Sequence, residues 1–259
     1  MELAAHLDDC PADGAHRIAE IEDKHFWFSA RAALIQRHLE ARFGDLQGQS
    51  VLDIGCGTGY VLGVLEKAGV KPTGCDMHQS ALDYARARTT GPLLLIDANE
   101  LQNADFDAAM LCDVIEHADN DVDLVQVAAA TVRDGGIVLV TVPAHQWLWT
   151  AIDDYSGHKR RYSRGQLGRV LRDAGLQDVR VSYFNRVLLP AQVARNLMAR
   201  GGGSDEAVRE AAVAMPSPLI NNLMSKAMTA DRYLPPMVLG ASLIATGVVR
   251  RTGTRPNQG

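Results

Sequence analysis

A glycine-rich segment is the first part of this 259-residue sequence whose residue types and spacing suggest chemistry. The apolar run at residues 51–54 leads directly into Gly55-Cys56-Gly57-Thr58-Gly59, and a helical pattern follows. Glycines leave the backbone open to close approach by a ligand. The spacing is G-x-G-x-G, whereas a dinucleotide site needs a third glycine where this chain has Tyr60. The loop therefore disfavours a nicotinamide dinucleotide, and a tight turn from strand to helix is the alternative interpretation.

Aspartates stand at the ends of three successive apolar runs. Asp53 lies inside the run before the glycines, Asp76 follows Gly59 by 17 residues, and Asp97 closes the third run. An unpaired carboxylate in an apolar strand is costly, so Asp53 favours a cationic ligand. Asp76 stands where an acid accepts hydrogen bonds from ribose hydroxyls, and Asp97 could meet an adenine amine. Together the three acids predict a site for a nucleoside that carries positive charge.

Three histidines are candidates for removing a proton from an acceptor group. His117 follows the fourth apolar run, and His145 and His158 follow the fifth. Imidazole titrates near neutral pH, which suits a general base. His117 is our first candidate, with His145 and His158 in reserve. The alternative is that each ring only hydrogen-bonds neighbouring groups or shapes a pocket.

The stretch after the fifth apolar run is basic and aromatic. It contains the run 158–162, His-Lys-Arg-Arg-Tyr, with Trp147, Trp149 and Tyr155 nearby. A charge run is usually a solvated face, but guanidinium groups also match carboxylates and phosphates. We predict that an anionic substrate group binds in this stretch. The candidate residues are His145, Tyr155, His158, Arg160, Arg161 and Tyr162.

Apolar runs and helical stripes alternate along most of the chain. The runs predict strands at 51–54, 73–76, 93–96, 106–112, 137–142, 179–184 and 242–249. Helices are predicted at 30–43, 59–68 and 166–174, with one that opens at a Ser80 capping box and one that carries Val122 to Val132 and stops at Gly135-Gly136. The alternation predicts an α/β fold with a doubly wound, mostly parallel sheet of seven strands, similar to a Rossmann sheet.

This pattern divides the chain into four parts. We predict an N-terminal helical cap at 1–45, an α/β core at 46–186, a helical insertion or lid at 187–240, and a final strand with its tail at 241–259. The insertion contains the sequence 201–204, Gly-Gly-Gly-Ser, which is typical of a flexible joint. It also holds most of the methionines, whose thioethers adapt to irregular apolar ligands. Core packing, a dimer face and contact with a membrane surface are the alternatives.

Composition excludes several classes of protein. With 47% hydrophobic residues, 22% charged residues and a mean hydropathy of −0.08, the chain is typical of a globular protein. The net charge of −5 provides no overall attraction to nucleic acid or to an anionic membrane. The longest uncharged apolar run, 237–249, is shorter than the ~20 residues of a membrane helix.

The N-terminus and the cysteines predict a cytoplasmic location. The first residues carry acids where a secretory signal would carry Lys or Arg. Cys10, Cys56, Cys75 and Cys112 lack the spacing of metal ligands. We therefore expect free thiols in a reducing compartment and no metal site.

Over about residues 25–185 the chain resembles the class I S-adenosylmethionine-dependent methyltransferases. The glycine loop, Asp76 and the segment 106–117 carry this resemblance, and the ending Asp-Val-Ile-Glu-His at 113–117 recurs in small-molecule methyltransferases. The segments 25–31 and 157–163 are similar to a bacterial subgroup often associated with glycan or secondary-metabolite pathways. In related quinone-type O-methyltransferases an N-terminal arginine binds the cofactor carboxylate. Arg31 matches that arginine here, and an exposed helix arginine is the alternative.

The resemblance implies S-adenosylmethionine as the cofactor. The residues that would bind it are Arg31, Asp53, Gly55, Cys56, Gly57, Gly59, Asp76, Met77, Asp97 and Cys112. The hypothesis is methyl transfer to oxygen or nitrogen of a small metabolite, with an anionic or lipid-like compound among the candidates. The alternative is a regulatory protein that binds the cofactor or its demethylated product without catalysis. We expect no nucleic-acid partner and no integral membrane segment, and a homodimer stays open.

Overall fold

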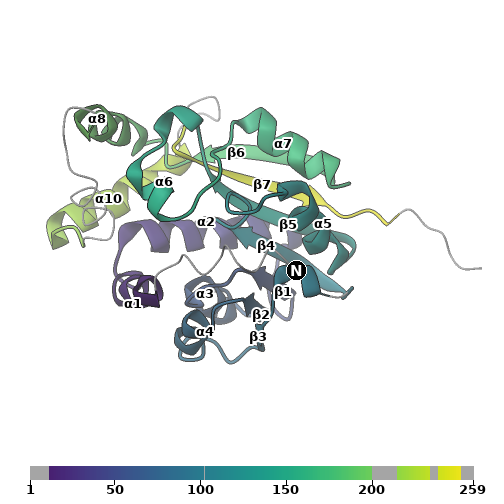
Figure 1. Ribbon diagram of the computed structural model, residues 1–259. Coiled ribbons are helices and arrows are strands. Elements are labelled where there is room, and N and C mark those ends of the chain that lie inside the picture. Colours follow the sequence, from purple (N-terminus) through teal and green to yellow (C-terminus); the bar gives the residue numbers. More distant parts are fainter. Residues whose placement is uncertain (1–11, 102, 200–214, 234–238, 252–259) are drawn as a thin grey trace, which may run out of the picture.

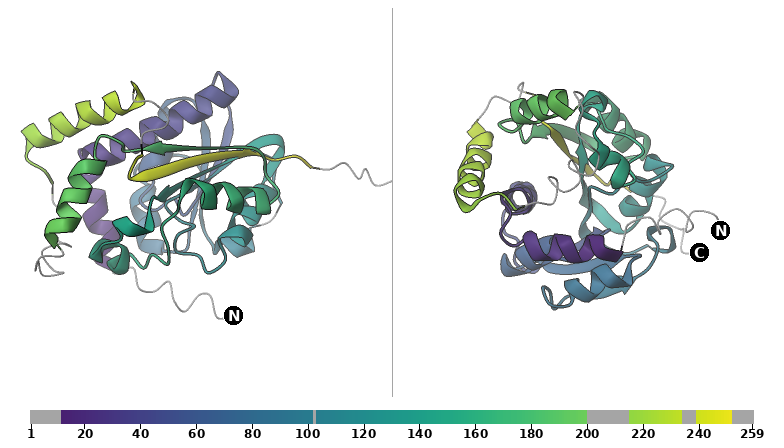
Figure 2. Two further views of the ribbon diagram at one scale, coloured as in Figure 1. Left: turned by 90° about the horizontal axis from the view of Figure 1, so that it is seen from above. Right: turned by 60° about the vertical axis from the view of Figure 1, so that its left-hand side comes forward.

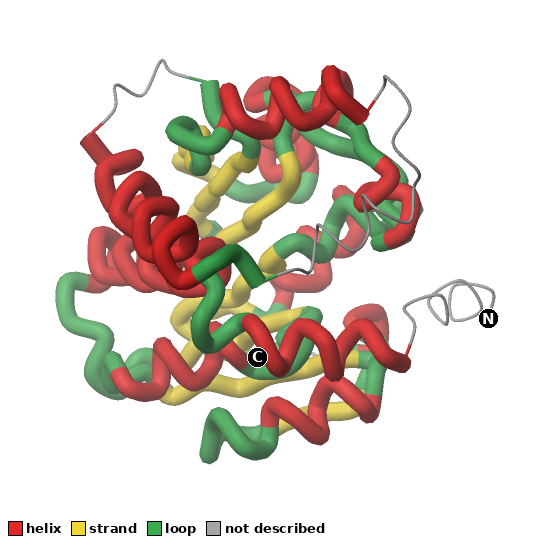
Figure 3. Tube along the Cα trace, turned by 90° about the vertical axis from the view of Figure 1, so that its left-hand side faces the viewer, coloured by secondary structure: helices red, strands yellow, loops and turns green. Residues whose placement is uncertain are grey.

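A seven-stranded sheet forms the centre of the molecule, with helices on both faces (Figures 1 and 3). The structure is a computed structural model that describes residues 12–101, 103–199, 215–233 and 239–251. The strands are β1 (Ser50–Ile54), β2 (Lys71–Asp76), β3 (Leu93–Leu95), β4 (Phe106–Cys112), β5 (Val132–Pro143), β6 (Gln177–Phe184) and β7 (Ser242–Val248). Their order in the sheet is β3-β2-β1-β4-β5-β7-β6. The predicted mostly parallel sheet is confirmed.

The helices occupy the connections between these strands. They are α1 (Ala12–Ile21), α2 (Phe26–Phe43), α3 (Tyr60–Lys67), α4 (Gln79–Ala85), α5 (Asp121–Ala130), α6 (Ala151–Tyr155), α7 (Arg164–Asp173), α8 (Leu189–Ala199) and α10 (Pro218–Ala230). Three 3-10 turns, η2 (Ala98–Glu100), η3 (Gln146–Leu148) and η4 (Asp231–Tyr233), complete the described elements. No helix in the described ranges is long and apolar enough to cross a membrane.

Parallel pairing brings the carboxyl ends of the first strands to one edge of the sheet. β1 pairs in parallel with β2 and β4, β2 with β3, and β4 with β5. β7 runs antiparallel between β5 and β6. Ligands bind at the carboxyl edge in open α/β sheets, because the loops there leave a crevice where the strand order reverses. The loops after β1, β2 and β4 therefore define where to look for a site.

Alternation along the strands divides the core into two apolar layers. Leu52 on β1 and Leu111 on β4 face α5 and α7, and Val51 and Met110 face α2 and α3. All four side chains are buried, as expected of strands covered on both faces. Asp53 is two residues from Val51, so it shares the face that α2 covers.

Helix α10 lies along α2, far from it in sequence (Figure 2). The Asn221 side chain accepts a hydrogen bond from Phe26 N at 3.0 Å and donates one to Lys24 O at 2.7 Å. Helix α8 reaches the loop after β5, where Asn196 Nδ2 donates to Leu148 O at 3.0 Å. The predicted Gly-Gly-Gly-Ser joint at 201–204 lies outside the described residues. The described parts of the 187–240 segment are thus joined to α2 and to the carboxyl edge.

Two local predictions are wrong. Helix α4 begins at Gln79 with His78 as its N-cap, so Ser80 lies inside the helix and makes no capping box. Helix α5 ends at Ala130, and Val132 opens β5 instead of extending the helix. Val132 enters the strand because Phe106 on β4 pairs with it, while Phe106 N donates to Thr131 O at 3.0 Å. The boundary between α5 and β5 is therefore set by strand pairing, which the apolar pattern of a helix does not reveal.

Candidate active site

The glycine loop connects β1 to α3 and has an open surface at its centre. Gly55, Gly57 and Gly59 have φ values of 74°, 52° and 77°. A Cβ on Gly55 would lie 2.7 Å from a Val114 methyl, and one on Gly59 would lie 2.7 Å from Ala85 Cβ. A Cβ on Gly57 would meet nothing within 4 Å in the described part of the chain. Two of the glycines therefore allow packing, whereas Gly57 leaves backbone accessible to a ligand.

Asp76 binds the glycine loop from the end of β2. Its carboxylate accepts hydrogen bonds from Gly57 N at 2.9 Å and from His78 N at 2.9 Å, and the His78 ring lies 3.2 Å away. Burial acts to raise the pKa of Asp76, but the hydrogen bonds from His78 and Gly57 outweigh it and lower the pKa. Asp76 is therefore a fixed, ionised acceptor beside the loop, as a ribose-binding residue must be.

Asp53 is a buried acid that needs a partner. The residue is 2% exposed, and its Oδ1 has no hydrogen-bond partner among the residues that the structure describes. Burial raises its pKa to about 7, against an opposing effect of Arg31, and the charge of Asp76 raises it further. A cationic ligand beside Asp53 would offset this cost. The unpartnered oxygen, the open Gly57 and the ionised Asp76 fit the amino, sulfonium and ribose groups of S-adenosylmethionine.

The other predicted cofactor residues lie along the same edge. Asp97 follows β3 and accepts hydrogen bonds from Asn99 N and Nδ2, both at 2.8 Å, so it caps η2. Met77 follows Asp76 and is half-buried, and Cys112 ends β4. Burial raises the pKa of the Cys56 and Cys112 thiols, so both stay protonated at neutral pH. None of the described cysteines forms a disulfide, and Cys10 lies outside the described residues.

Arg31 projects from α2 toward the end of β4. It forms an ion pair with Asp113, and its guanidinium lies 4.5 Å from the centroid of the Trp27 ring. Its side chain is 14% exposed, so the alternative of an exposed helix arginine is wrong. Asp113 has φ of 60° and accepts a hydrogen bond from Thr141 Oγ1 at 3.1 Å. Sequence reasoning missed Asp113 as a partner, although it is the first residue of the Asp-Val-Ile-Glu-His motif.

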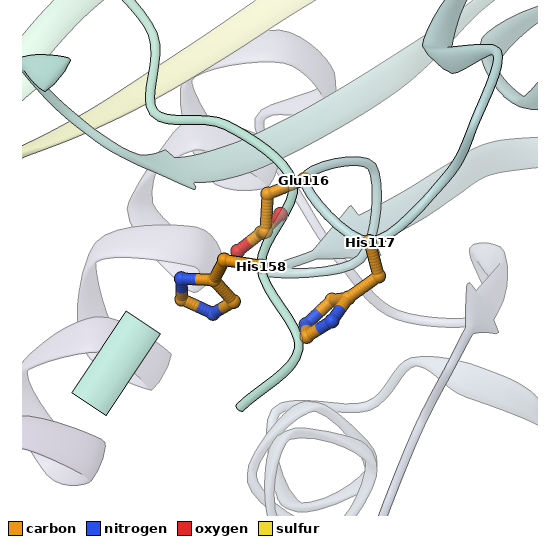
Figure 4. Close-up of side chains that lie close together, drawn as sticks. All are labelled: Glu116, His117 and His158. Atoms are coloured by element: carbon orange, nitrogen blue, oxygen red, sulfur yellow. The ribbon is translucent and has the colours of Figure 1, made fainter. Parts of the chain in front are cut away.

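Two predicted histidines meet beside a buried glutamate (Figure 4). His117 follows β4, His158 follows α6, and their ring centroids lie 4.8 Å apart at 78°. Burial lowers the pKa of His117 to about 4, and His158 adds to the effect. His117 is therefore neutral at physiological pH. Glu116, fully buried next to His117, carried no assigned role in the sequence analysis.

Asp153 on α6 organises the loop that carries His158. The acid is completely buried and lies 2.8 Å from His158 Nδ1. It accepts two hydrogen bonds from Arg161, from Nε at 2.7 Å and from Nη2 at 2.8 Å. Thr150 and Asp153 also form a capping box at the start of α6. The Thr-x-x-Asp spacing at 150–153 is a sequence signal that could have identified this acid.

The arginines and the tyrosine of the basic run have partners inside the chain. Arg161 binds Asp153, and Arg160 donates to Ala118 O at 2.9 Å and pairs with Asp121. Tyr162 is 2% exposed, and its hydroxyl donates to Asp121 at 2.8 Å. These side chains are therefore bound within the chain, and the role of Arg160, Arg161 and Tyr162 in binding an anionic substrate group stays a prediction. They hold the loop after α6 against the loop after β4.

His145 and Tyr155 come from the stretch between β5 and α7. His145 has φ of 62° and is stacked on Tyr183 with ring centroids 5.2 Å apart. Burial lowers the pKa of His145, against an opposing contact with the backbone of Gly240. Tyr155 ends α6 and is 37% exposed. The role of His145 and Tyr155 in binding the substrate stays a prediction.

Sequence comparison assigns the chain to a family. The family profile described as a methyltransferase domain matches residues 24–181. A ubiquinone biosynthesis O-methyltransferase of Shewanella halifaxensis is 33% identical over 103 residues, which cover 37% of this chain and 44% of that protein. A tRNA (carboxymethyluridine(34)-5-O)-methyltransferase of Mus musculus is 31% identical over 46% of this chain and 17% of that protein. The chain thus spans less than half the length of these curated relatives.

Solved structures share the fold over most of the chain. Phosphoethanolamine N-methyltransferase 2 of Haemonchus contortus, in complex with S-adenosyl-L-methionine, matches with a TM-score of 0.62 and 18% identity, covering 95% of this chain and 59% of that one. A methyltransferase of Haloferax volcanii, in complex with its Trm112 activator, matches with a TM-score of 0.61 and 18% identity, covering 96% and 98%. The chain belongs to the class I S-adenosylmethionine-dependent methyltransferases, whose cofactor fits the residues at the carboxyl edge.

Proposed function

We propose that this protein transfers a methyl group from S-adenosylmethionine to an oxygen or nitrogen atom of a small metabolite. The observation that carries the proposal is the unpartnered, buried carboxylate of Asp53 beside Asp76 and the open backbone of Gly57. An acid in this position favours a cationic cofactor. The bound cofactor supplies a methyl group on a good leaving group, so the protein contributes mainly proximity and alignment.

His117 provides the acceptor side of the proposed reaction. It follows β4 at the same sheet edge as Asp53, and its pKa of about 4 keeps the imidazole neutral at physiological pH, so that a ring nitrogen can accept a hydrogen bond from the acceptor group. His158 lies beside it, held by the buried Asp153. We infer that this pair makes the acceptor atom nucleophilic, and that His117 contacts the acceptor.

Oxygen is the acceptor atom that we favour. The similarity to a ubiquinone biosynthesis O-methyltransferase, 33% identical over 37% of this chain, supports it. Because Arg160 and Arg161 are bound within the chain, the anionic substrate loses its main support. An uncharged or lipid-like metabolite with a hydroxyl group therefore fits best. We place the enzyme in the cytoplasm.

The described helices of the 187–240 segment contact α2 and the loop after β5. Helix α10 packs on α2, which carries Arg31, and α8 contacts the loop after β5 through Asn196. We propose that this segment acts as a lid over the substrate. Helix α10 also exposes three apolar side chains, Leu219, Ile220 and Leu223, which could form a homodimer contact. Light scattering tests whether the protein is a dimer.

Calorimetry with S-adenosylmethionine and its demethylated product tests the cofactor site. Wild-type protein should bind both, Asp76→Ala should weaken both, and Asp105→Asn should bind normally. Asp105 is the matched control because it is exposed and pairs with Arg251 at the opposite edge of the sheet. No binding by the wild-type protein would refute the proposal.

Mass spectrometry of cell extracts incubated with labelled cofactor tests catalysis. A metabolite that gains one methyl group with the wild-type protein, and gains less with His117→Ala, is the expected result. Tight cofactor binding with no methylated product in any extract would instead support a non-catalytic regulatory protein.

A further inference from the structure

The side chains of Glu116, His117 and His158 form a compact group of metal-ligating type (Figure 4). One carboxylate oxygen and one nitrogen from each ring lie within 4.8 Å of one another. Glu116 and His117 come from the loop after β4, and His158 comes from the loop after α6. Three ligand atoms that close need only small side-chain rotations to reach a common ion at about 2.0–2.2 Å.

The buried carboxylate of Glu116 is a second, independent observation that favours a bound cation. The residue is 0% exposed, and neither Oε1 nor Oε2 has a hydrogen-bond partner within the described ranges. Asp113 and Asp153 add negative charge near it, and Arg31 adds a positive charge. A buried carboxylate in such surroundings is costly unless a cation or a hydrogen-bond donor compensates it. Two unsatisfied oxygens beside two imidazoles favour a metal ion as that partner.

The surrounding residues already orient the ligands. His158 Nδ1 lies 2.8 Å from the buried Asp153, which leaves Nε2 of that ring available for coordination. Metal-binding histidines commonly hold a carboxylate with their second nitrogen in this manner. The two loops are also joined directly, because Lys159 N donates to Glu116 O at 2.8 Å and Arg160 donates to Ala118 O at 2.9 Å. The contacts of Arg160 and Arg161 thus help to hold the proposed ligands in place, a role that the sequence did not suggest.

We propose that Glu116, His117 and His158 bind a divalent transition-metal ion, with Zn²⁺ as the representative of the class. Two imidazoles and one carboxylate suit zinc, iron, cobalt or manganese better than the all-oxygen sites of calcium or magnesium. Three protein ligands leave at least one coordination position open, as in catalytic sites. The proposal replaces the sequence-based expectation of no metal site.

The position of the ion suggests its use, and this part rests on the proposed function. A hydroxyl acceptor on the open position would bind through its oxygen, and the ion would lower the pKa of that hydroxyl. The hydroxyl proton would leave to solvent water. The oxygen lone pair would then form the new C–O bond as the C–S bond of the cofactor breaks, and the sulfonium would become a neutral thioether. His117 would act as a ligand in this scheme instead of as the base.

Metal binding can be measured without any methyl transfer. The protein is stripped with a chelator, dialysed against Zn²⁺ and analysed for bound metal, and Co²⁺ is then added to record its visible absorption bands. We expect about one ion per chain and cobalt bands that Zn²⁺ displaces. Glu116→Gln and His158→Asn should each weaken Zn²⁺ binding by about 100-fold or more, since even second-shell changes cost about 10–100-fold.

Two further variants sharpen the test. Asp153→Asn should weaken Zn²⁺ binding less than Glu116→Gln does, and His16→Asn should leave it unchanged. His16 is the control because it is an exposed histidine on α1. Circular dichroism melts identify any variant that fails to fold, and Glu116→Gln, which keeps the shape of the side chain, is the decisive variant in that event.

The outcomes separate this proposal from the proposed function. Wild-type protein that binds no Zn²⁺ or Co²⁺, or binding that survives both Glu116→Gln and His158→Asn, would overturn the metal site. Methyl transfer that proceeds undiminished in chelator would overturn only the role of the ion in activating the acceptor. Failure to bind S-adenosylmethionine while Zn²⁺ binds normally would refute the proposed function and leave the metal site standing.

Discussion

The guanidinium of Arg31 on α2 is ion-paired with the carboxylate of Asp113, the residue that directly follows β4. The two residues are far apart in sequence, and their contact joins the N-terminal helix to the loop that carries Glu116 and His117. Asp113 is held from its other side by Thr141 Oγ1 at 3.1 Å. The pair therefore fixes how the proposed cofactor side and the acceptor side of the site face one another.

Replacing Arg31 should harm both stability and cofactor binding. In Arg31→Met the carboxylate of Asp113 loses its ion-pair partner while it stays largely buried, which typically costs about 3 kcal/mol of the free energy of unfolding. Urea unfolding measures this loss, and calorimetry should show weaker S-adenosylmethionine binding. Arg86→Met is the control, since the Arg86–Asp83 pair is exposed and should change stability by less than about 1 kcal/mol. Equal effects of the two variants would contradict the importance of the Arg31 contact.

Asp53 should make the stability of the cofactor-free protein fall as pH rises. Its pKa is about 7 in the folded protein and near the ordinary 3.8 when unfolded. Between these values the folded state holds a proton that the unfolded chain has released, so the stabilising contribution is full below pH ~4 and is lost as pH rises through ~7. The difference of roughly three pH units corresponds to at most about 4 kcal/mol. Asp53→Asn cannot ionise at this position. In urea unfolding, the free energy of unfolding of the wild-type protein should therefore fall relative to that of Asp53→Asn as the pH rises over this range.

Cofactor binding should show the opposite pH dependence at the same residue. A cationic ligand favours the ionised form of Asp53, so the affinity of wild-type protein for S-adenosylmethionine should increase from pH 5 to 8. Calorimetry in buffers of different ionisation enthalpy should detect proton release on binding near pH 6. Asp53→Asn should bind more weakly and lose this pH dependence. An unchanged proton count in Asp53→Asn would show that another group titrates.

The glycine loop offers a pair of variants that separate folding from binding. Gly55→Ala places a methyl group 2.7 Å from Val114 and should reduce the expression and melting temperature of the protein. Gly57→Ala meets open space and should cost only about 1–2 kcal/mol for its left-handed backbone. We expect Gly57→Ala to fold and yet lose most of its cofactor affinity in calorimetry, because the new methyl group occupies the ligand's space. Normal binding by Gly57→Ala would place the cofactor elsewhere.

His117 should affect turnover more than cofactor affinity. Loss of an acceptor-activating group typically costs about 10²- to 10⁴-fold in rate, so His117→Ala should lower kcat by about that amount with little change in the Kd of S-adenosylmethionine. Because the pKa of His117 is about 4, the ring stays neutral above pH 5. The pH profile of kcat should therefore show no inflection near 6.5 that depends on His117. An inflection there that disappears in His117→Ala would contradict the low pKa of His117.

The sequence predicts the cofactor side of the site far better than the acceptor side. Asp53 and Asp76 end neighbouring strands, and parallel pairing brings such ends together in any fold of this type. The meeting of His117 with His158 depends instead on two loops that contact each other through Lys159 and Arg160. Neither loop has a periodic pattern, so their contact has no signature in the sequence.

Charge pairing explains why the sequence did not reveal the internal partners of the basic run. A basic run at 158–162 has the same appearance whether its guanidinium groups face a ligand or a buried acid. Here Asp153 is completely buried and binds Arg161 with both carboxylate oxygens. Only the three-dimensional position of α6, a helix of one turn, shows which of the two partners is present.

The antiparallel direction of β7 has a practical consequence for handling the protein. β7 begins opposite Pro143 and Phe184 at the carboxyl edge and ends opposite Ile137 and Gln177 at the other edge. Residues 249–251 therefore lie at the sheet edge opposite to the loops that carry His117 and His158. There Arg251 donates a hydrogen bond to Asp105. Immobilising the protein through a linker attached after Arg251 would turn its reaction face outward, toward the bulk solution of a biosensor or flow reactor.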